Sequence, residues 1–174
     1  NCKGAAIINV GEIGFVFSVA EGDGVLLKHN DDGSWGPPSA LMFTGSSGGV
    51  VFGKTKKQIL LLPQTTYGFN MLTAGMKYEL GAQIGCAAGP YGREGTISGG
   101  AGGHGVDVTF SYIFEEGAWL NVGINNYFLE NVDFENQAFC GKHVVAKDIV
   151  EGAVDVPKGK GVEELQAKLA ELSK

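Results

Sequence analysis

Apolar residues alternate with other residues over three long segments of the chain, and this period of two constrains the fold more than any other feature. The segments cover residues 78–86, 106–114 and 120–128. Successive side chains of a β-strand point to opposite faces, so a period of two predicts strands with one buried and one exposed face. Residues 15–19 alternate in the same way. The sequence therefore predicts an antiparallel sheet.

Glycine is unusually frequent, at 29 of 174 residues, and many glycines lie inside the predicted strands. No Gly-X-Y period accompanies them, which excludes collagen. Glycine inside a strand is typical of bulges, sharp curvature or close contact between backbones. We therefore expect a curved sheet or partial β-barrel. Turn residues at 22–24 and 30–34 predict that the chain reverses direction there.

Helical patterns are fewer. Val162 begins a segment in which Leu165, Leu169 and Leu172 recur on one side of a helix. We expect this C-terminal helix to bury its leucines against the sheet, so that deleting residues 161–174 lowers stability by several kcal/mol. Shorter helices are predicted at 65–74, 133–140 with Asp133 as N-cap, and 146–151. The fold class is thus α+β: a glycine-rich, curved antiparallel sheet or partial β-barrel with a few short helices and a C-terminal helix.

Composition excludes several classes of protein. The hydrophobic fraction of 44% supports a core, and 174 residues fit a single domain. The net charge of −6 argues against non-specific nucleic-acid binding. Cys2, Cys86 and Cys140 are widely separated, so neither a metal site nor a disulfide framework is predicted. The longest apolar run, at 59–62, is far shorter than the ~20 residues of a membrane span.

Two nominal nucleotide motifs fail on context. Residues 48–55 match G-x-x-x-x-G-K-[ST], but the interior is Val-Val-Phe and the following run to Leu62 is β-like. We expect a hairpin turn at Gly53-Lys54 and no nucleotide. Residues 100–105 match G-x-G-x-x-G but open a predicted strand, which favours a mobile glycine loop. The three histidines are scattered, so no catalytic set and no cofactor is predicted.

The densest basic cluster comprises Lys54, Lys56 and Lys57, three cations in four positions. Such a cluster would suit phosphate groups of a lipid or a polymer. The alternative is a solvated turn whose lysines protect an edge strand. Arg93 follows a turn-like Gly-Pro-Tyr-Gly stretch and is the weaker candidate. We expect charge reversal of the three lysines to abolish binding to phosphoinositide liposomes without unfolding the domain.

Several motifs, in chain order, resemble the SYLF lipid-binding domain. The most specific is DGSWGPPSA at residues 32–40, which matches the family signature DGSW-x-x-PSA. The others are Lys3–Ile8, Gly14–Ser18, Gly24–Leu27, Gly48–Gly53, Ile59–Leu62, Ala87–Arg93, Tyr112 before Gly117, the N-x-x-F-x-G pattern of Asn136–Gly141, and Asp148–Gly152. The resemblance implies one SYLF-like domain over 1–174, N-terminally incomplete because family members usually carry an amphipathic basic helical segment ahead of the Lys3 equivalent.

The family resemblance also implies a function. It predicts a non-enzymatic module that binds phosphoinositides, located in the cytoplasm as a peripheral membrane protein, with an anionic phospholipid surface as partner. The alternative is an actin-linked or structural scaffold that acts through protein–protein contacts, since the domain of fungal relatives binds and bundles actin filaments. Lipid binding should fall steeply with salt, whereas contact through apolar surface should not.

Overall fold

The computed structural model describes residues 2–74, 78–80, 86–98, 101–102, 105–106, 109–159 and 161–173. In these residues the main element is a five-stranded antiparallel sheet of order β1-β2-β7-β3, with β4 also paired to β7. Its strands are β1 (Gly4–Lys28), β2 (Ser39–Pro63), β3 (Tyr78–Leu80), β4 (Cys86–Ser98) and β7 (Thr109–Asn131). A small second sheet joins β5 (Ala101–Gly102) to β6 (Gly105–Val106).

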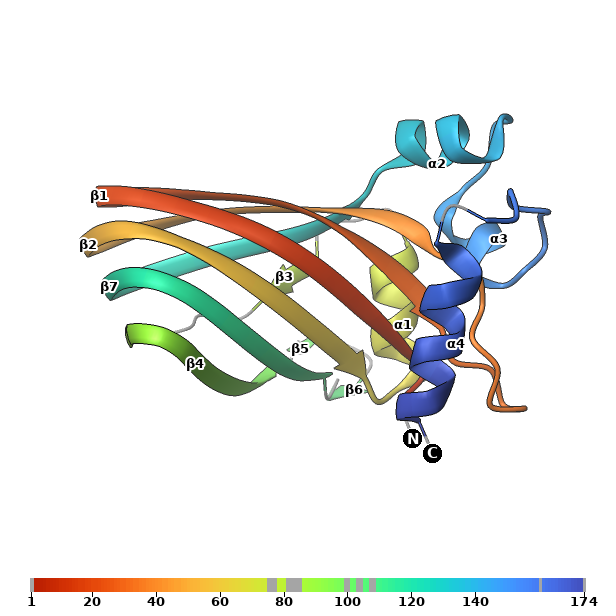
Figure 1. Ribbon diagram of the computed structural model, residues 1–174, viewed down its shortest axis with the longest axis horizontal. Coiled ribbons are helices and arrows are strands. Elements are labelled where there is room, and N and C mark those ends of the chain that lie inside the picture. The colour runs from red at the N-terminus through yellow and green to blue at the C-terminus, as the bar shows by residue number, and fades with distance from the viewer. Residues whose placement is uncertain are drawn as a thin grey trace.

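The three longest strands bend at a common end. β1 and β2 have 25 residues each and β7 has 23. A straight strand of that length would reach about 80 Å, but these strands run out from the helical end, bend and return (Figure 1). In β1 the register shifts between Phe15 and Phe17, and Val16 between them has a φ of 70°. The sheet therefore folds over itself without closing, as the curved-sheet prediction requires.

The parts of each long strand before and after its bend are called its two arms. Close contact between the two arms of β1 explains two of its glycines. A β-carbon at Gly22 would lie 2.3 Å from the carbonyl oxygen of Asn9, and one at Gly24 would lie 2.6 Å from that of Ile7. Only glycine allows backbones to approach this closely. The predicted turn at 22–24 is therefore wrong: these residues belong to β1, and their glycines serve packing between the arms.

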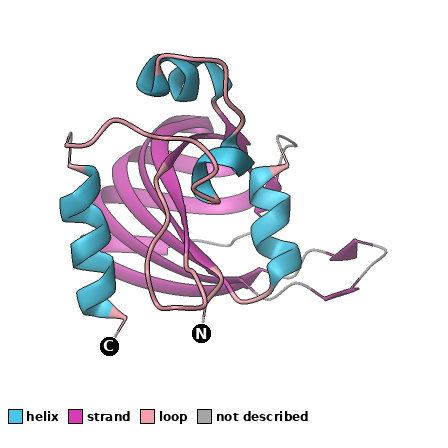
Figure 2. Ribbon diagram, turned by 90° about the vertical axis from the view of Figure 1, so that its right-hand side faces the viewer, coloured by secondary structure: helices cyan, strands magenta, loops and turns pink. Residues whose placement is uncertain are grey.

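The helices lie at the opposite end of the molecule from the bends, with α1 and α4 on opposite sides of the sheet (Figure 2). They are α1 (Thr66–Thr73), α2 (Asp133–Cys140), α3 (Ala146–Val150) and α4 (Val162–Leu172). All four predicted helices are confirmed. Thr65 caps α1, since its hydroxyl accepts a hydrogen bond from the Gly68 amide at 3.0 Å. The N-cap of α2 is Val132 rather than the predicted Asp133, which is the first helical residue.

Among the predicted turns and strands, one turn is confirmed and two strand segments are joined. Residues 30–34 form the predicted turn, closed by a hydrogen bond from the Asn30 amide to the Ser34 carbonyl. The segments 106–114 and 120–128 were predicted as separate strands, but from residue 109 onward both belong to β7. Part of the 78–86 segment and part of the 100–105 glycine motif lie outside the described residues.

Buried apolar side chains form two clusters on either side of the sheet. The larger lies between the two arms of the folded strands and includes Ile8, Phe43 and Leu129. The smaller lies under α4 and contains Trp35 and Leu169. Within the predicted leucine stripe Leu169 is buried and Leu165 is half-buried, but Leu172 is 72% exposed. The stripe prediction is therefore wrong for Leu172, because the helix ends beyond the edge of this cluster.

Candidate binding surface

The predicted basic cluster lies inside β2, not in a turn. β2 continues through Gly53 and Lys54 and pairs there with both β1 and β7, so the predicted hairpin turn is wrong. Because side chains alternate along a strand, Lys54 and Lys56 are exposed on the outer face of the sheet. Lys57 points to the inner face, between the arms. The structure therefore brings two of the three lysines together and separates the third.

Lys57 belongs to a buried polar network. Its Nζ lies 2.8 Å from Oε2 of Glu12, and the side-chain exposures are 13% for the lysine and 0% for the glutamate. Ser18 Oγ donates to Oε1 of the same carboxylate at 2.6 Å, and the Tyr127 hydroxyl donates to Oε2 at 3.3 Å. The hydroxyl of Ser47 lies 2.5 Å from that of Ser18. These five residues are the buried network from here on.

The buried network ties both arms of the folded strands together. Glu12 and Ser18 flank the bend of β1, while Ser47 and Lys57 lie on either side of the bend of β2. Burial raises the pKa of Tyr127 to about 12; the nearby Lys57 cation opposes this shift and the Glu12 carboxylate adds to it. Since these groups satisfy one another, we assign the network a structural role.

This pairing changes how the basic cluster must be tested. A glutamate at position 57 would place a second carboxylate against Glu12 in a buried site, and like charges there are strongly destabilising. Reversal of all three lysines should therefore destabilise the domain, so a loss of binding in that variant would not isolate the effect of surface charge. A clean test reverses Lys54 and Lys56 alone.

The segment that imitates a phosphate-binding loop is an extended strand. Thr55 is buried, and its hydroxyl donates to the Glu116 carbonyl of β7 at 2.9 Å. β2 continues to Pro63 without a helix after the lysine. A phosphate loop needs amides wrapped around the ligand at a helix N-terminus, and here the backbone pairs with two neighbouring strands instead. The β-like prediction for this segment is confirmed.

Arg93 lies on β4, whose neighbour in the sheet is β7. Its backbone pairs with Phe114, whereas Lys56 pairs with Glu116 on the other side of the same strand. β2 and β4 are two strand spacings apart, about 10 Å. The backbone of Arg93 is thus near the row of Lys56, and its side chain lies outside the described residues. Its role in binding stays a prediction.

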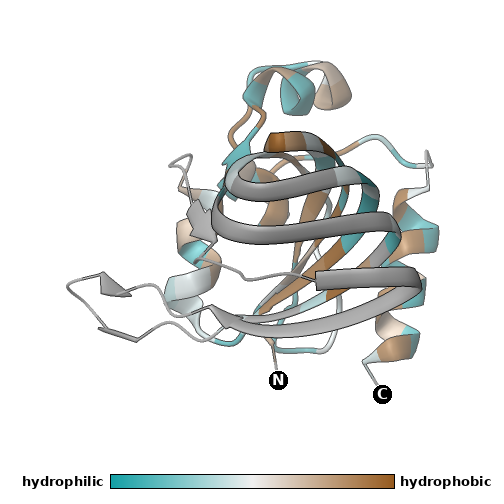
Figure 3. Ribbon diagram, turned by 90° about the vertical axis from the view of Figure 1, so that its left-hand side faces the viewer, coloured by the Kyte–Doolittle hydropathy of each residue, from teal (hydrophilic) through white to brown (hydrophobic). Residues whose placement is uncertain are grey.

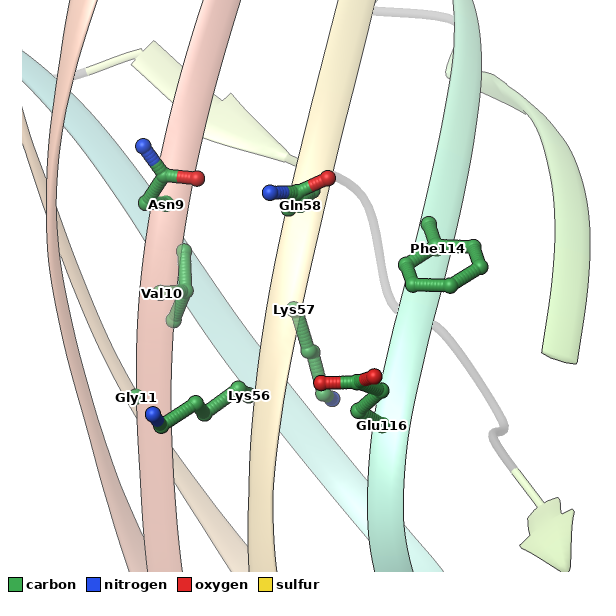
Figure 4. A pocket seen from close by; sticks show the side chains of 8 residues that line it. All are labelled: Asn9, Val10, Gly11, Lys56, Lys57, Gln58, Phe114 and Glu116. Carbon is green, nitrogen blue, oxygen red and sulfur yellow. The ribbon is translucent and has the colours of Figure 1, made fainter. Parts of the chain in front are cut away.

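A groove crosses the outer face of β1, β2 and β7. At its polar end a hollow of about 400 Å³ contains a row of Asn9, Gln58 and Phe114 and a second row with Lys56 and Glu116 (Figure 4). At its apolar end a hollow of about 830 Å³ extends to α4. That end is lined by Ile7, Asn9, Gln58, Ile59, Leu60, Tyr112, Ile113, Phe114, Leu169 and Leu172. The two hollows form one surface, which we call the outer groove.

The bend of β1 exposes large apolar side chains that sequence reasoning placed on a buried face. Phe15 is 74% exposed and Phe17 is 73% exposed. Every second residue of β1 lies on the inner face, which is occupied by Ile8 and Val10 before the bend. At the bend the buried residues of this face are Glu12 and Ser18. The apolar positions of 15–19 are therefore out of phase with the core. The signal was present in the sequence: the positions in phase with Ile8 and Val10 include Glu12 and Ser18, whereas the odd-numbered positions from 13 to 19 are all apolar.

Neither a membrane-spanning helix nor a metal-binding cluster is found among the residues that the structure describes. None of the helices there is long and apolar enough to cross a membrane. No group of three or more His, Cys, Asp or Glu residues among the described side chains is placed to hold a metal ion.

Comparison with known proteins gives a consistent set of matches. A family model described as "Ysc84: Las17-binding protein actin regulator" matches residues 44–172, which confirms the SYLF resemblance. Protein YSC84 of Saccharomyces cerevisiae is 29% identical over 155 residues, covering 89% of this chain and 33% of that protein. SH3 domain-containing YSC84-like protein 1 of Mus musculus is 26% identical over 163 residues, covering 94% and 47%. The chain thus spans between a third and a half of these relatives. No solved structure matches it.

Proposed function

We propose, from the premise that this chain belongs to the Ysc84 family of Las17-binding protein actin regulators, that it is a non-enzymatic module whose own ligand is an anionic membrane surface. It would act as a peripheral membrane protein in the cytoplasm, with phosphoinositides among its lipids. The observation that carries the proposal is the outward direction of Lys54 and Lys56 in a chain of net charge −6.

The electrostatic contribution follows from which lysines are available. Each lysine near an anionic surface contributes about 1 kcal/mol, so Lys54 and Lys56 together give at most roughly thirtyfold in affinity, since Glu116 lies in register with Lys56 on the same face. The charge of Lys57 is compensated by Glu12 inside the fold and adds little. Arg93, on the neighbouring side of β7, would extend the same surface.

Vesicle co-sedimentation tests the proposal. Wild-type protein should pellet with phosphatidylcholine vesicles that carry a phosphoinositide and stay in solution with phosphatidylcholine alone. Reversal of both outer lysines, Lys54→Glu with Lys56→Glu, should reduce pelleting by more than tenfold. A control with the same change in net charge, Lys142→Glu with Lys158→Glu, alters two exposed lysines outside the sheet and should pellet like wild type. Equal pelleting of the two double variants would contradict the assignment.

A second function is favoured by the outer groove and by the family description. The exposed Tyr112 and Leu172 line its apolar end, and tyrosine is enriched where proteins contact one another. An actin-linked protein contact through this groove would act in actin regulation without lipid. In that case wild type should pellet with actin filaments, and Tyr112→Ser with Leu172→Ser should not. Unchanged pelleting of this variant would remove the groove from the function.

A further inference from the structure

Five large apolar side chains are exposed on one short segment of β1. The exposed fractions are 63% for Ile13, 74% for Phe15, 49% for Val16, 73% for Phe17 and 57% for Val19. We call residues 13–19 the apolar bend. Isolated exposed apolar residues are ordinary, but a contiguous group of this size marks an interaction surface. The bend forms the brown upper arc of the sheet in Figure 3.

The outward direction of these side chains is built into the fold. Glu12 lies before and Ser18 after the register shift of the bend, and the Ser18 hydroxyl donates a hydrogen bond to the Glu12 carboxylate on the inner face at 2.6 Å. The chain between them must turn outward, and Val16 does so with a φ of 70° that a β-branched residue rarely adopts. The buried network occupies the inner face, and the side chains of both phenylalanines are exposed on the outer face.

Position and charge point to one kind of partner. The bend lies at the extreme end of the molecule, away from the helices and both chain termini (Figure 1). It is convex, so a folded protein would need a matching cavity, whereas lipids adapt to any shape. Two exposed charges border the bend among the described side chains of β1 and β2: Lys54, which pairs in register with Ile13, and Glu21, two residues beyond Val19. Lys54 is the nearer of the two, since its partner Ile13 is three residues from Val16 and Glu21 is five, and a cation at the base of an apolar tip complements an anionic lipid surface.

We propose that the apolar bend inserts between lipid head groups and anchors the protein in the outer part of the acyl-chain layer. This inference rests on the proposed membrane function and specifies how the contact is made. Binding by Lys54 and Lys56 alone would disappear at high salt, because exposed charges are screened. If Phe15 and Phe17 insert, part of the membrane binding persists at high salt. This part is stronger where lipid packing is loose, as in small, curved vesicles.

Substitution of the two phenylalanines provides the first test. Vesicles of phosphatidylcholine with phosphatidylserine, small and large, serve as the probe. Phe15→Ser with Phe17→Ser should weaken binding about tenfold or more and abolish the preference for small vesicles. The matched control is Phe134→Ser, since Phe134 is 72% exposed on α2, and it should bind like wild type. Circular dichroism and urea unfolding check that both variants keep the wild-type fold.

Depth measurement provides a test that removes no apolar side chain. Phe17→Trp and Phe134→Trp are titrated with the same vesicles carrying brominated acyl chains, which quench tryptophan at short range. Quenching above the wild-type level in Phe17→Trp alone supports insertion. Quenching no greater than wild type in Phe17→Trp overturns it.

The possible outcomes separate the two claims. Insertion is refuted, and the membrane function stands, if three results occur together. Wild type pellets with anionic vesicles, high salt abolishes this pelleting completely, and the phenylalanine variant binds like wild type. If wild type pellets with no vesicle, the membrane function fails and insertion fails with it. If the phenylalanine variant instead loses pelleting with actin filaments, or converts a wild-type dimer to a monomer, the bend is a protein contact and the lipid assignment is wrong.

Discussion

Removing Lys57 should destabilise the fold far more than removing its exposed neighbour Lys56. In Lys57→Met the Glu12 carboxylate, with no exposed side-chain surface, loses the ammonium group that lies 2.8 Å away. Deleting one partner of a buried ion pair costs about 3–5 kcal/mol. The carboxylate keeps its hydrogen bonds from Ser18 and Tyr127, so we expect the lower part of that range, about 3–4 kcal/mol.

This loss is large compared with the ordinary stability of a domain, about 5–15 kcal/mol. With a urea dependence of about 1–3 kcal/mol per molar, the unfolding midpoint should fall by more than about 1 M. Equilibrium unfolding in urea, followed by circular dichroism, measures it. Lys56→Met removes the same charge from the exposed face and should change stability by no more than about 0.5 kcal/mol.

A double variant separates the unpaired charge from lost packing. Glu12→Leu with Lys57→Met removes both charges and keeps similar volume, and such replacements of buried pairs are often neutral or stabilising. The double variant should therefore recover at least half of the loss seen in Lys57→Met. The reasoning is refuted if Lys57→Met is as stable as Lys56→Met, or if the double variant is no more stable than Lys57→Met.

Three further predictions concern packing and pH. Gly22→Ala places a β-carbon 2.3 Å from a backbone oxygen of the other arm of β1, and it should lower the free energy of unfolding in urea by about 1–3 kcal/mol or more. Gly11→Ala, whose β-carbon would have nothing within 4 Å, should lower it by less than about 0.5 kcal/mol. Equal losses in the two variants would contradict the close packing of the arms. Leu169→Ala should cost about 2–4 kcal/mol and Leu172→Ala, at a 72% exposed position, about 0.5 kcal/mol at most, and equal melting temperatures would show that α4 is misplaced. The pKa of Tyr127 is raised from 10.0 to about 12, so its contribution to stability is complete below pH 10 and is lost as the pH rises toward 12. Urea unfolding across that window should show a steeper loss for wild type than for Tyr127→Phe, and parallel curves would exclude burial of the phenol.

The sequence predicts the local elements of this fold well. Helix signals are short-range, such as the hydroxyl of Thr65 at the start of α1 and the left-handed Gly141 at the end of α2. Glycine is harder to interpret, because it has two uses. At 22–24 it suggested a turn, but Gly22 and Gly24 serve contact with a part of β1 distant in sequence. Such contacts are tertiary and leave no local pattern.

Only part of the candidate site could be predicted from the sequence, again because its contacts join residues that are distant in the chain. Alternation along an unbroken β2 would have separated Lys57 from Lys54 and Lys56, but Gly53 suggested a turn that removes this constraint. Glu12 as the partner of Lys57 depends on strand pairing and cannot be inferred from spacing. The exposed phenylalanines of the bend have the alternation of a buried face, and only the phase of the whole strand shows that they point outward.

Hydrogen–deuterium exchange of the wild-type protein on anionic vesicles tests the central claim most directly, because it locates the membrane contact without any substitution. Exchange is compared for the free protein, with phosphatidylcholine vesicles, and with vesicles that also carry phosphatidylserine. Slower exchange confined to peptides that cover residues 11–20 and 53–57, on the anionic vesicles only, is the result that we predict. Unchanged exchange in residues 11–20 on vesicles that bind the protein, with slower exchange in α4 and along the outer groove instead, would contradict the account.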